Sequence, residues 1–454
     1  MTSLFKKYDV AGPRYTSYPT VPYWETAPTQ LKWIAALRTE LNHSAQKNRG
    51  AAIYIHLPFC EALCTFCACN KIITKNHERS RPYIETVLRE WKNYLKQLQM
   101  QKILVAEIHL GGGTPTFMTP DELQDLLSDL YDGIALTSDA QLSFESDPRV
   151  TTIEHLKTLY DLGFRRISLG VQDYDPAVQE AINRVQSVEM VGGLAEIARA
   201  VGYTGVNFDL VYGLPHQTIP SIEKTITAVI AQQPDRIAFY SYAHVPWVGK
   251  TGQRKFTDGD VPVGAAKRAL YECGRTMFLA AGYVEIGMDH FALPHDDLAR
   301  ALHEKTLFRN FMGYTPHHVS PMIGLGVSAI GDAWTAFVQN EKDITAYNAR
   351  VTAGELPIAR GHCLTTEDMV LRQHILNLMT QGETHWYDKD LFTDDLQNVP
   401  GRLAEFMVDG LVEITPDGIR ITSAGRPFLR NICMAFDARL QRRQPDKPLF
   451  SRTM

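Results

Sequence analysis

Short apolar strands alternate with amphipathic helical stretches through the middle of the chain. The first expected strand is AAIYIHLPF, which begins at Ala51, and the others are ILVAEIHL, QLSFES, RRISLG, GVNFDLVYG, DRIAFYSYAHV and YVEIGMDHFA. Helical periodicity separates strands at 81–97, 121–131 and 188–201. Strand, helix and strand repeat about six times, which predicts a parallel sheet with right-handed crossovers, closed or nearly closed into a TIM-like α/β barrel. Such a barrel carries its chemistry at the carboxyl ends of its strands.

The two ends of the chain follow other patterns. Before the barrel, YDVAGPRYTSYPT is rich in Pro, Gly and Tyr and predicts an extended arm, followed by a helix near 31–41. Near the other end, helices are expected at 367–380 and 400–409, then two strands around the PDG turn of LVEITPDGIRITSAG, and a last helix. This pattern indicates a small, mostly helical, winged-helix-like domain. We therefore divide the chain into an N-terminal arm, a barrel with its extension, and a C-terminal domain: 1–49, 50–364 and 365–454.

Composition narrows the class of protein. The 454 residues are 44% hydrophobic and 21% charged, as in a globular protein with a large core. The formal net charge is -5 and no long Lys/Arg block occurs, which argues against nucleic acid or anionic lipid as a partner. The first residues, MTSLFKKYDV, lack the apolar stretch of a signal peptide, and no apolar run approaches the roughly 18 residues of a membrane span. We therefore expect a cytoplasmic protein whose partners are small molecules and other proteins.

Four of the seven cysteines, Cys60, Cys64, Cys67 and Cys69, lie within ten positions, directly after the first strand. The spacing C-x3-C-x2-C suits an iron-sulfur cluster, because three thiolates can hold three corners of a cubane and leave one iron open to another ligand. Zinc is less favoured, because it commonly takes four ligands in two separated pairs and no second pair follows. Cys69 is too close to Cys67 to join the same cluster without strain, so it is either free for another role or a small buried residue.

The segment IHLPFCEALCTFCACN resembles the signature of the radical S-adenosylmethionine (SAM) superfamily. The resemblance implies a partial (β/α)6 radical SAM barrel in which Cys60, Cys64 and Cys67 bind a [4Fe-4S] cluster. It also implies that SAM chelates the fourth iron through its amino and carboxylate groups. In such enzymes an electron from the reduced cluster splits SAM into methionine and a 5′-deoxyadenosyl radical.

Residues near the cysteines are candidates for binding SAM. Tyr54 shares one face of the first strand with His56 and is either a SAM contact or a core residue. LGGGTP follows the second strand, and its glycines let backbone N–H groups approach an anionic ligand. Glu145 ends the strand in SFESDP, where a carboxylate can accept hydrogen bonds from ribose hydroxyls; the alternative is a surface Glu. Four more residues lie at or just after later strands, although ordinary loop or core roles fit them equally well: Gln172, Arg184, Asp209 and Ala243.

Matches to one family extend over nearly the whole chain. The segments GPRYTSYPT, FCACNK, GGGTPT, ESDPR, GVQD, NFDLVYGLP, IGMDHFA, RNFMGYT, GVSAIGD and RNICMAFD resemble those of the oxygen-independent coproporphyrinogen III oxidases, or coproporphyrinogen dehydrogenases. The resemblance implies that four residues bind the SAM on the cluster: Tyr54, Gly112, Glu145 and Ile330. It implies a second SAM site formed by Phe66, Gly113, Thr114, Gln172, Arg184, Asp209 and Ala243. The catalytic candidates are Cys69, Tyr54 and Phe311.

The activity implied by the resemblance is the anaerobic oxidative decarboxylation of two propionates of coproporphyrinogen III to vinyl groups, giving protoporphyrinogen IX. The radical must be shielded from solvent, so the N-terminal arm and the C-terminal domain are expected to act as lids. Arg14 in the arm is a candidate partner for a propionate, although an exposed loop arginine is the commoner case. The usual electron donor for such clusters is a flavodoxin or a ferredoxin.

Two positions depart from the family pattern. Ala68 stands where the family often has Gly, a small change that should permit the loop. Met312 stands where some members have Gln, and it cannot supply an amide hydrogen bond. The rival functions are a haem-binding chaperone and a haem-degrading methyltransferase of the same superfamily, which typically lack the C-x-C pair that ends at Cys69. A cluster-containing regulator that binds nucleic acid is disfavoured by the acidic charge balance.

Overall fold

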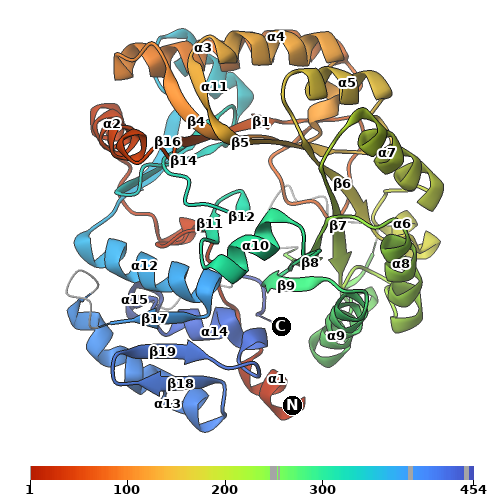
Figure 1. Cartoon of the computed structure of the whole chain (residues 1–454), viewed down its shortest axis with the longest axis vertical. Coiled ribbons are helices and arrows are strands. Elements are labelled where there is room, and N and C mark those ends of the chain that lie inside the picture. Colours follow the sequence, from red (N-terminus) through yellow and green to blue (C-terminus); the bar gives the residue numbers. More distant parts are fainter. Residues whose placement is uncertain (1, 246–252, 254–255, 387–391, 444–448, 454) are drawn as a thin grey trace.

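Figure 1 shows the computed structural model, which describes residues 2–245, 253, 256–386, 392–443 and 449–453. Within those residues, one large sheet has twelve strands in the order β16-β15-β14-β13-β1-β4-β5-β6-β7-β8-β10-β9. Six neighbouring strands pair in parallel: β1 (Ala51–Leu57), β4 (Ile103–Gly112), β5 (Ile134–Ser146), β6 (Arg166–Gln172), β7 (Gly205–Tyr212) and β8 (Arg236–Ser241). The expected partial barrel is confirmed, and its sheet is open rather than closed.

Helices cover the outer face of the parallel strands (Figure 1). They are α3 (Ser80–Leu98), α4 (Pro120–Tyr131), α5 (Ile153–Asp161), α6 (Pro176–Ala181), α7 (Val188–Val201), α8 (Ile219–Ala231) and α9 (Gly264–Ala280). Helix α4 begins where Thr119 and Glu122 form a reciprocal capping box, which satisfies two of the free N–H groups of the first turn. Apolar side chains of these helices and of the strands form the largest hydrophobic core. The helices therefore hold the strand ends in fixed positions around the barrel mouth.

Both edges of the sheet carry strands that the sequence pattern did not identify. At one edge β13 (Met322–Leu325) pairs in parallel with β1 and is followed by antiparallel strands β14 (Ile330–Asp332), β15 (Ala336–Asn340) and β16 (Ile358–Cys363). At the other edge YVEIGMDHFA, expected as one strand, forms the antiparallel pair β9 (Val284–Gly287) and β10 (His290–Ala292). The single-strand prediction was wrong because the backbone turns at Met288, which has a φ of 42°. A short hairpin, β11 (Phe308–Asn310) and β12 (Gly313–Thr315), follows α10 (Asp297–Glu304).

The helix expected near 31–41 is present as α2 (Gln30–Gln46), and helices are also present near the other end of the chain. Two further helices, α1 (Thr2–Tyr8) in the arm and α11 (Ile344–Thr352) before β16, were not predicted. The C-terminal part contains α12 (Thr366–Gln381), α13 (Val399–Val408), α14 (Leu429–Met434) and α15 (Ala438–Arg442). Beside them lies a small sheet in the order β17 (Glu383–His385), β19 (Gly418–Ile421), β18 (Val412–Thr415), which adds one strand to the predicted hairpin. The three-domain division stays a prediction.

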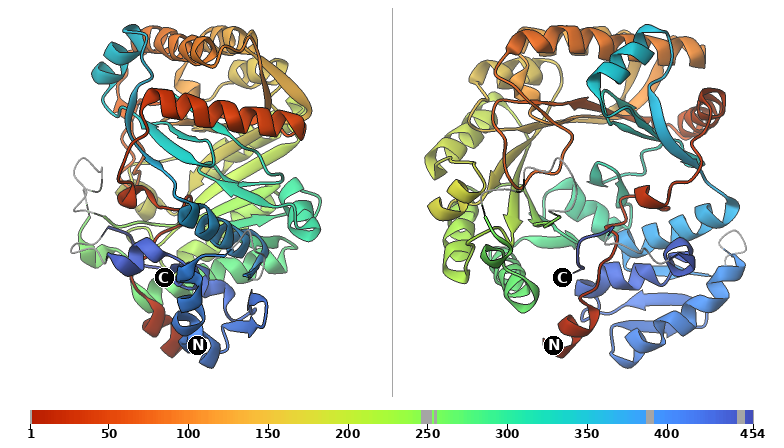
Figure 2. Two further views of the ribbon diagram at one scale, coloured as in Figure 1. Left: turned by 90° about the vertical axis from the view of Figure 1, so that its left-hand side faces the viewer. Right: turned by 180° about the vertical axis from the view of Figure 1, so that it is seen from behind.

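The N-terminal arm packs on the C-terminal helices, far away in sequence (Figure 2). Tyr8, Tyr15 and Tyr18 are buried in a second hydrophobic core together with residues of α12 and α14. Backbone hydrogen bonds join the two chain ends: Thr453 N–H donates to the carbonyl of Val10 at 2.7 Å. These contacts bring the arm across the molecule toward the barrel mouth. Among the described helices, none is long and apolar enough to cross a lipid bilayer.

Candidate functional site

The carboxyl ends of the parallel strands surround a cavity of about 630 Å³. Thirteen of the sixteen predicted site residues line it: Cys60, Cys64, Phe66, Cys67, Cys69, Gly112, Gly113, Thr114, Glu145, Gln172, Arg184, Asp209 and Ala243. The other three, Tyr54, Phe311 and Ile330, lie together in a small apolar cluster that includes Ala52 and Met322. The structure thus brings most of the predicted residues to one cavity at the barrel end where chemistry is expected.

The cysteine loop is anchored on several sides. Its ends meet where β2 (Phe59–Cys60) pairs with β3 (Ile72–Ile73). The ammonium of Lys71 donates to the carbonyls of Cys67 at 2.8 Å and Cys69 at 3.4 Å. On the far side, Asn183 Nδ2 donates to the carbonyl of Leu63 at 2.8 Å, and the thiol of Cys60 lies 3.6 Å from Thr114 Oγ1. The loop is therefore held in one shape with its thiols toward the cavity.

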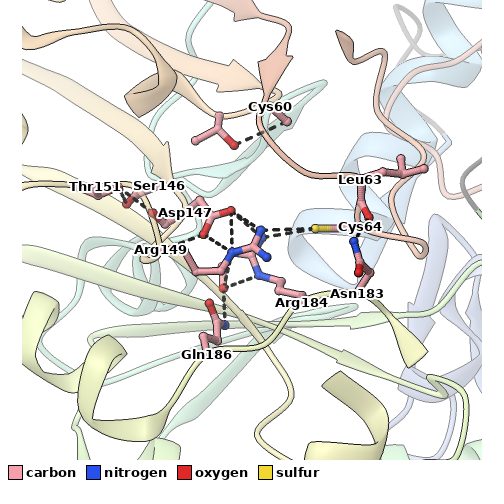
Figure 3. A network of polar contacts seen from close by, with 12 residues as sticks. Cys60, Leu63, Cys64, Ser146, Asp147, Arg149, Thr151, Asn183, Arg184 and Gln186 are labelled. Atoms are coloured by element: carbon pink, nitrogen blue, oxygen red, sulfur yellow. Dashed lines mark hydrogen bonds and ion pairs between the residues drawn. The ribbon is translucent and has the colours of Figure 1, made fainter. Parts of the chain in front are cut away.

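Two arginines face the thiol of Cys64 (Figure 3). Arg149 Nη2 and Arg184 Nη1 each lie 3.7 Å from Cys64 Sγ. Both arginines also bind Asp147, at 2.6 Å and 3.1 Å. Burial raises the pKa of Asp147, but the charges of Arg184 and Arg149 outweigh it and hold that pKa below its usual value. The two guanidinium groups therefore bring positive charge to the cavity wall at Cys64.

The thiols of Cys67 and Cys69 interact with each other. Their hydrogen bond lowers the pKa of Cys67 and raises the pKa of Cys69. The two thiols are therefore not equivalent, and the more acidic one belongs to Cys67, the last cysteine of the C-x3-C-x2-C spacing.

The donor set fits a [4Fe-4S] cluster. The three thiols of the C-x3-C-x2-C spacing lie on one loop and line the same cavity. In the part of the chain that the structure describes, no group of three His, Cys, Asp or Glu side chains converges as a single metal ion would require. A cubane does not need that convergence, because each thiolate binds a separate iron at its own corner.

The glycine turn after β4 approaches the cysteine loop closely. A Cβ on Gly113 would lie 2.6 Å from the backbone carbon of Pro58, and one on Gly112 would lie 2.8 Å from the ring of His56. Gly112 also has a φ of 115°, which other residues rarely adopt. The Gly112 N–H donates to Glu145 Oε2 at 3.2 Å. Only glycine fits these two positions, and the turn links the cysteine loop to Glu145.

Glu145 is an ionised acceptor at the cavity wall. Burial raises its pKa, but the hydrogen bond and charge of His109 and the N–H of Gly112 hold that pKa below the usual value. His109 Nε2 lies 3.6 Å from Glu145 Oε1, and its Nδ1 is 2.8 Å from Ser143 Oγ. About two fifths of the Glu145 side chain remains accessible from the cavity (43%). A charged carboxylate open to the cavity can accept hydrogen bonds from ligand hydroxyls.

The remaining predicted residues lie at strand ends or in the loops that follow, and neighbouring residues hold them. Arg184 Nη2 donates to the carbonyl of Gly170 at 2.7 Å. Gln172 has a φ of 68°, so its backbone leaves the strand direction at the cavity. Burial raises the pKa of Asp209 to about 6, and Ser168 Oγ donates to it at 2.7 Å. The carbonyl of Ala243 accepts a hydrogen bond from Gln253 at 2.7 Å.

Some residues differ from what the sequence suggested. Arg14 does line the cavity, but its guanidinium is paired with Asp289 in the β9–β10 turn. Asp147 and Arg149 were not singled out as site residues, although they follow Glu145 in the quoted segment ESDPR. Met312 lines a neighbouring cavity of about 140 Å³, which shares Glu145 and Asp209 with the cysteine cavity but is lined by none of the cysteines.

Comparison with known proteins gives the site a context. Residues 54–229 match the model of the radical SAM superfamily. The chain is similar to the oxygen-independent coproporphyrinogen III oxidase of Pseudomonas aeruginosa, at 40% identity over 96% of this chain and 95% of the relative. The relative of the same name from Escherichia coli is 36% identical, over 97% of this chain and 96% of its own length. A solved structure of coproporphyrinogen III oxidase (HemN) from Escherichia coli, described as a radical SAM enzyme, matches with a TM-score of 0.89 and 34% identity, over 97% of this chain and 99% of that one.

Proposed function

Because this chain belongs to the oxygen-independent coproporphyrinogen III oxidases of the radical SAM superfamily, we propose that it decarboxylates coproporphyrinogen III oxidatively without oxygen. Two propionate side chains become vinyl groups, and the product is protoporphyrinogen IX. The observation that carries the proposal is 40% identity over 442 residues to a relative that bears this name. The cofactors are a [4Fe-4S] cluster and SAM.

When bound, the cluster and SAM would supply a 5′-deoxyadenosyl radical able to take a hydrogen atom from the propionate β-carbon; loss of carbon dioxide, with one electron passing to an external acceptor, would then leave the vinyl group. The residues of this chain would position and shield that chemistry. Cys60, Cys64 and Cys67 would hold the cluster, and Arg149 and Arg184 would contact the sulfur of Cys64. Water must be kept out, because an exposed radical would be quenched. The N-terminal arm and the C-terminal domain are the lids in this proposal.

The SAM-binding roles of individual residues are part of the proposal. Tyr54, Gly112, Glu145 and Ile330 would hold the SAM on the cluster. The residues Phe66, Gly113, Thr114, Gln172, Arg184, Asp209 and Ala243 would form a second SAM site. All seven of these residues line one cavity, which supports the second site. Flavodoxin or ferredoxin as the electron donor, and a cytoplasmic location, are proposed on the general behaviour of such clusters and on the sequence pattern.

Anaerobic product analysis tests the function. The protein with its cluster is incubated with SAM, a reductant and coproporphyrinogen III, and the porphyrins are separated after oxidation. We expect protoporphyrin together with methionine and 5′-deoxyadenosine. Formation of deoxyadenosine and methionine without any vinyl product would instead favour the haem-binding or haem-degrading relatives.

Glu145→Gln is expected to weaken SAM binding about tenfold, because a charge-assisted hydrogen bond exceeds a neutral one by roughly 1 to 2 kcal/mol. Equilibrium binding of SAM to the protein with its cluster measures the effect. The matched control is Glu78→Gln, an exposed residue of the 3-10 helix His77–Arg79. Equal affinities in the two variants would remove Glu145 from the SAM site.

Cys69→Ser is expected to keep the iron content and to lower vinyl formation at least about tenfold. A serine hydroxyl is a little smaller than the thiol and can still donate a hydrogen bond to Cys67, but it is far less acidic, so it gives up its proton less readily. Iron per chain and porphyrin products are measured on the same sample. Loss of iron would make Cys69 a cluster ligand and refute the three-cysteine assignment.

A further inference from the structure

A second cavity of about 330 Å³ lies between the barrel and the C-terminal part of the chain. Its walls come from α9, the β9–β10 turn, the end of α12, β19 and the start of α14. Arg14 and Ser241 line both this cavity and the one that holds the cysteines. The two cavities are therefore neighbours that share a wall at Arg14.

Cations outnumber anions on the walls of the second cavity. The charged residues are Arg14, Arg268, Lys305, Arg420, Arg426 and Arg430 against Glu285, Asp289 and Glu383. The three carboxylates already have partners. Arg14 binds Asp289, Lys305 and Arg420 bind Glu383 at 2.7 Å and 3.1 Å, and Arg275 from outside the cavity binds Glu285 at 2.9 Å. Each carboxylate of the cavity is therefore already paired with a cation other than Arg268, Arg426 or Arg430.

Three guanidinium groups of the cavity have no carboxylate partner on its walls within the described residues. Arg430 is 8% exposed and donates only to carbonyls, including Pro13 at 3.0 Å and Arg452 at 3.1 Å. Arg268 is 9% exposed, its Nε is buried without a hydrogen-bond partner, and its charge is shared with Glu272, which lies outside the cavity. Arg426 is exposed at the cavity wall. Arg430 is thus a buried arginine without a carboxylate partner, which is costly, so an anionic ligand in the cavity would stabilise it.

The negative charge of the substrate in the proposed function matches the positive charge of this cavity. Coproporphyrinogen III carries four propionates, of which two react and two remain. The cavity at the cysteines must already take the cluster, SAM and the reacting propionate. The macrocycle therefore needs additional space with positive charge next to that cavity, and the second cavity supplies both.

We propose that the cavity lined by Arg268, Arg426 and Arg430 is the subsite for the non-reacting propionates of the tetrapyrrole. This inference rests on the proposed function and names its substrate-recognition residues. Arginine suits the task because its planar guanidinium can bind a carboxylate through two hydrogen bonds. Arg14, fixed by Asp289, marks the passage between this subsite and the reacting centre.

Binding of coproporphyrin III, a stable tetracarboxylate, tests the subsite without turnover. Its fluorescence is titrated with wild type, Arg426→Gln and the double variant Arg268→Gln/Arg426→Gln, all carrying the cluster. We expect Kd to rise about threefold to tenfold in the single variant and further in the double variant. The tetramethyl ester of coproporphyrin III, which lacks the charges, should bind the wild type and the double variant equally in the same dilute detergent. The matched control is Arg89→Gln, an exposed residue of α3 that lies outside both cavities.

A second measurement separates this inference from the function it rests on. The KM for coproporphyrinogen III should rise in Arg426→Gln, which folds because its side chain is exposed. A Kd for coproporphyrin III within twofold of wild type in the double variant would overturn the subsite, whatever the products of wild type. Failure of the wild type to form any vinyl product would overturn the proposed function instead, while the Kd series would still report on the cavity.

Discussion

Cys64→Ser is expected to remove the cluster and to lower vinyl formation by at least about a hundredfold. Even partners that only orient the ligands of a metal site cost about 10-fold to 100-fold when they are lost, and Cys64 is a ligand itself. The substitution also removes the sulfur atom that Arg149 and Arg184 contact. Iron and sulfide per chain, the visible absorption of the cluster and the porphyrin products are measured together.

Cys273→Ser is the control for Cys64→Ser. Cys273 is half-buried on α9, next to Glu223 and Met277, away from the cysteine loop. Its replacement should leave iron content and products at the wild-type level. A Cys64→Ser protein with full iron and full activity would refute the cluster assignment.

Glu90→Ala is expected to destabilise the fold by about 3 kcal/mol or more, because it leaves buried donors without an acceptor. Glu90 lies on α3 and is fully buried. Its carboxylate accepts hydrogen bonds from Gly326 N–H at 2.8 Å, Asn340 Nδ2 at 2.7 Å and the Tyr347 hydroxyl at 2.6 Å. It thus joins α3 to the edge strands and to α11. Denaturant unfolding of wild type, Glu90→Ala and the exposed α3 control Glu85→Ala measures the loss.

Glu90 should also make the free energy of unfolding depend on pH, in a direction that its pKa defines. Burial raises the pKa of Glu90 to about 7, against the opposing effect of its three hydrogen bonds. The folded chain therefore holds this proton more tightly than the unfolded chain between pH 4.5 and about 7. The contribution of Glu90 to the free energy of unfolding is complete below that window and is lost as the pH rises through it. The slope should be absent from Glu90→Ala, and a slope equal to that of wild type would contradict the assignment.

Local patterns in the sequence predicted the parts of the site that depend on local geometry. The cysteine spacing and the Gly112 and Gly113 turn lie within short segments, so their chemistry could be read before any fold was known. The alternating strands and helices likewise predicted the parallel part of the barrel. The edge strands β13 to β16 are three to six residues long, and no helix separates β13, β14 and β15, so the repeat of strand and helix could not identify them.

Contacts between distant segments could not be predicted. Arg14 meets Asp289 across 275 positions, and Glu90 meets Tyr347 across 257. The turn at Met288 has a positive φ at a residue other than glycine, so the sequence offers no usual turn signal there. The separate role of Cys69 stays a prediction from spacing, and the raised pKa of its thiol depends on a hydrogen bond to Cys67 that only the folded loop makes.

Because the two chain ends contact each other, the N-terminal arm can reach its final place only late in synthesis. The arm emerges first during synthesis, yet Arg430 holds the carbonyls of Gly12 and Pro13, and Thr453 bonds to Val10. Arg14 is next to these residues, so it reaches its place at the cavity only after more than 400 further residues have been added. The contacts that fix the arm beside Arg14 can therefore form only in chains that reach residue 453.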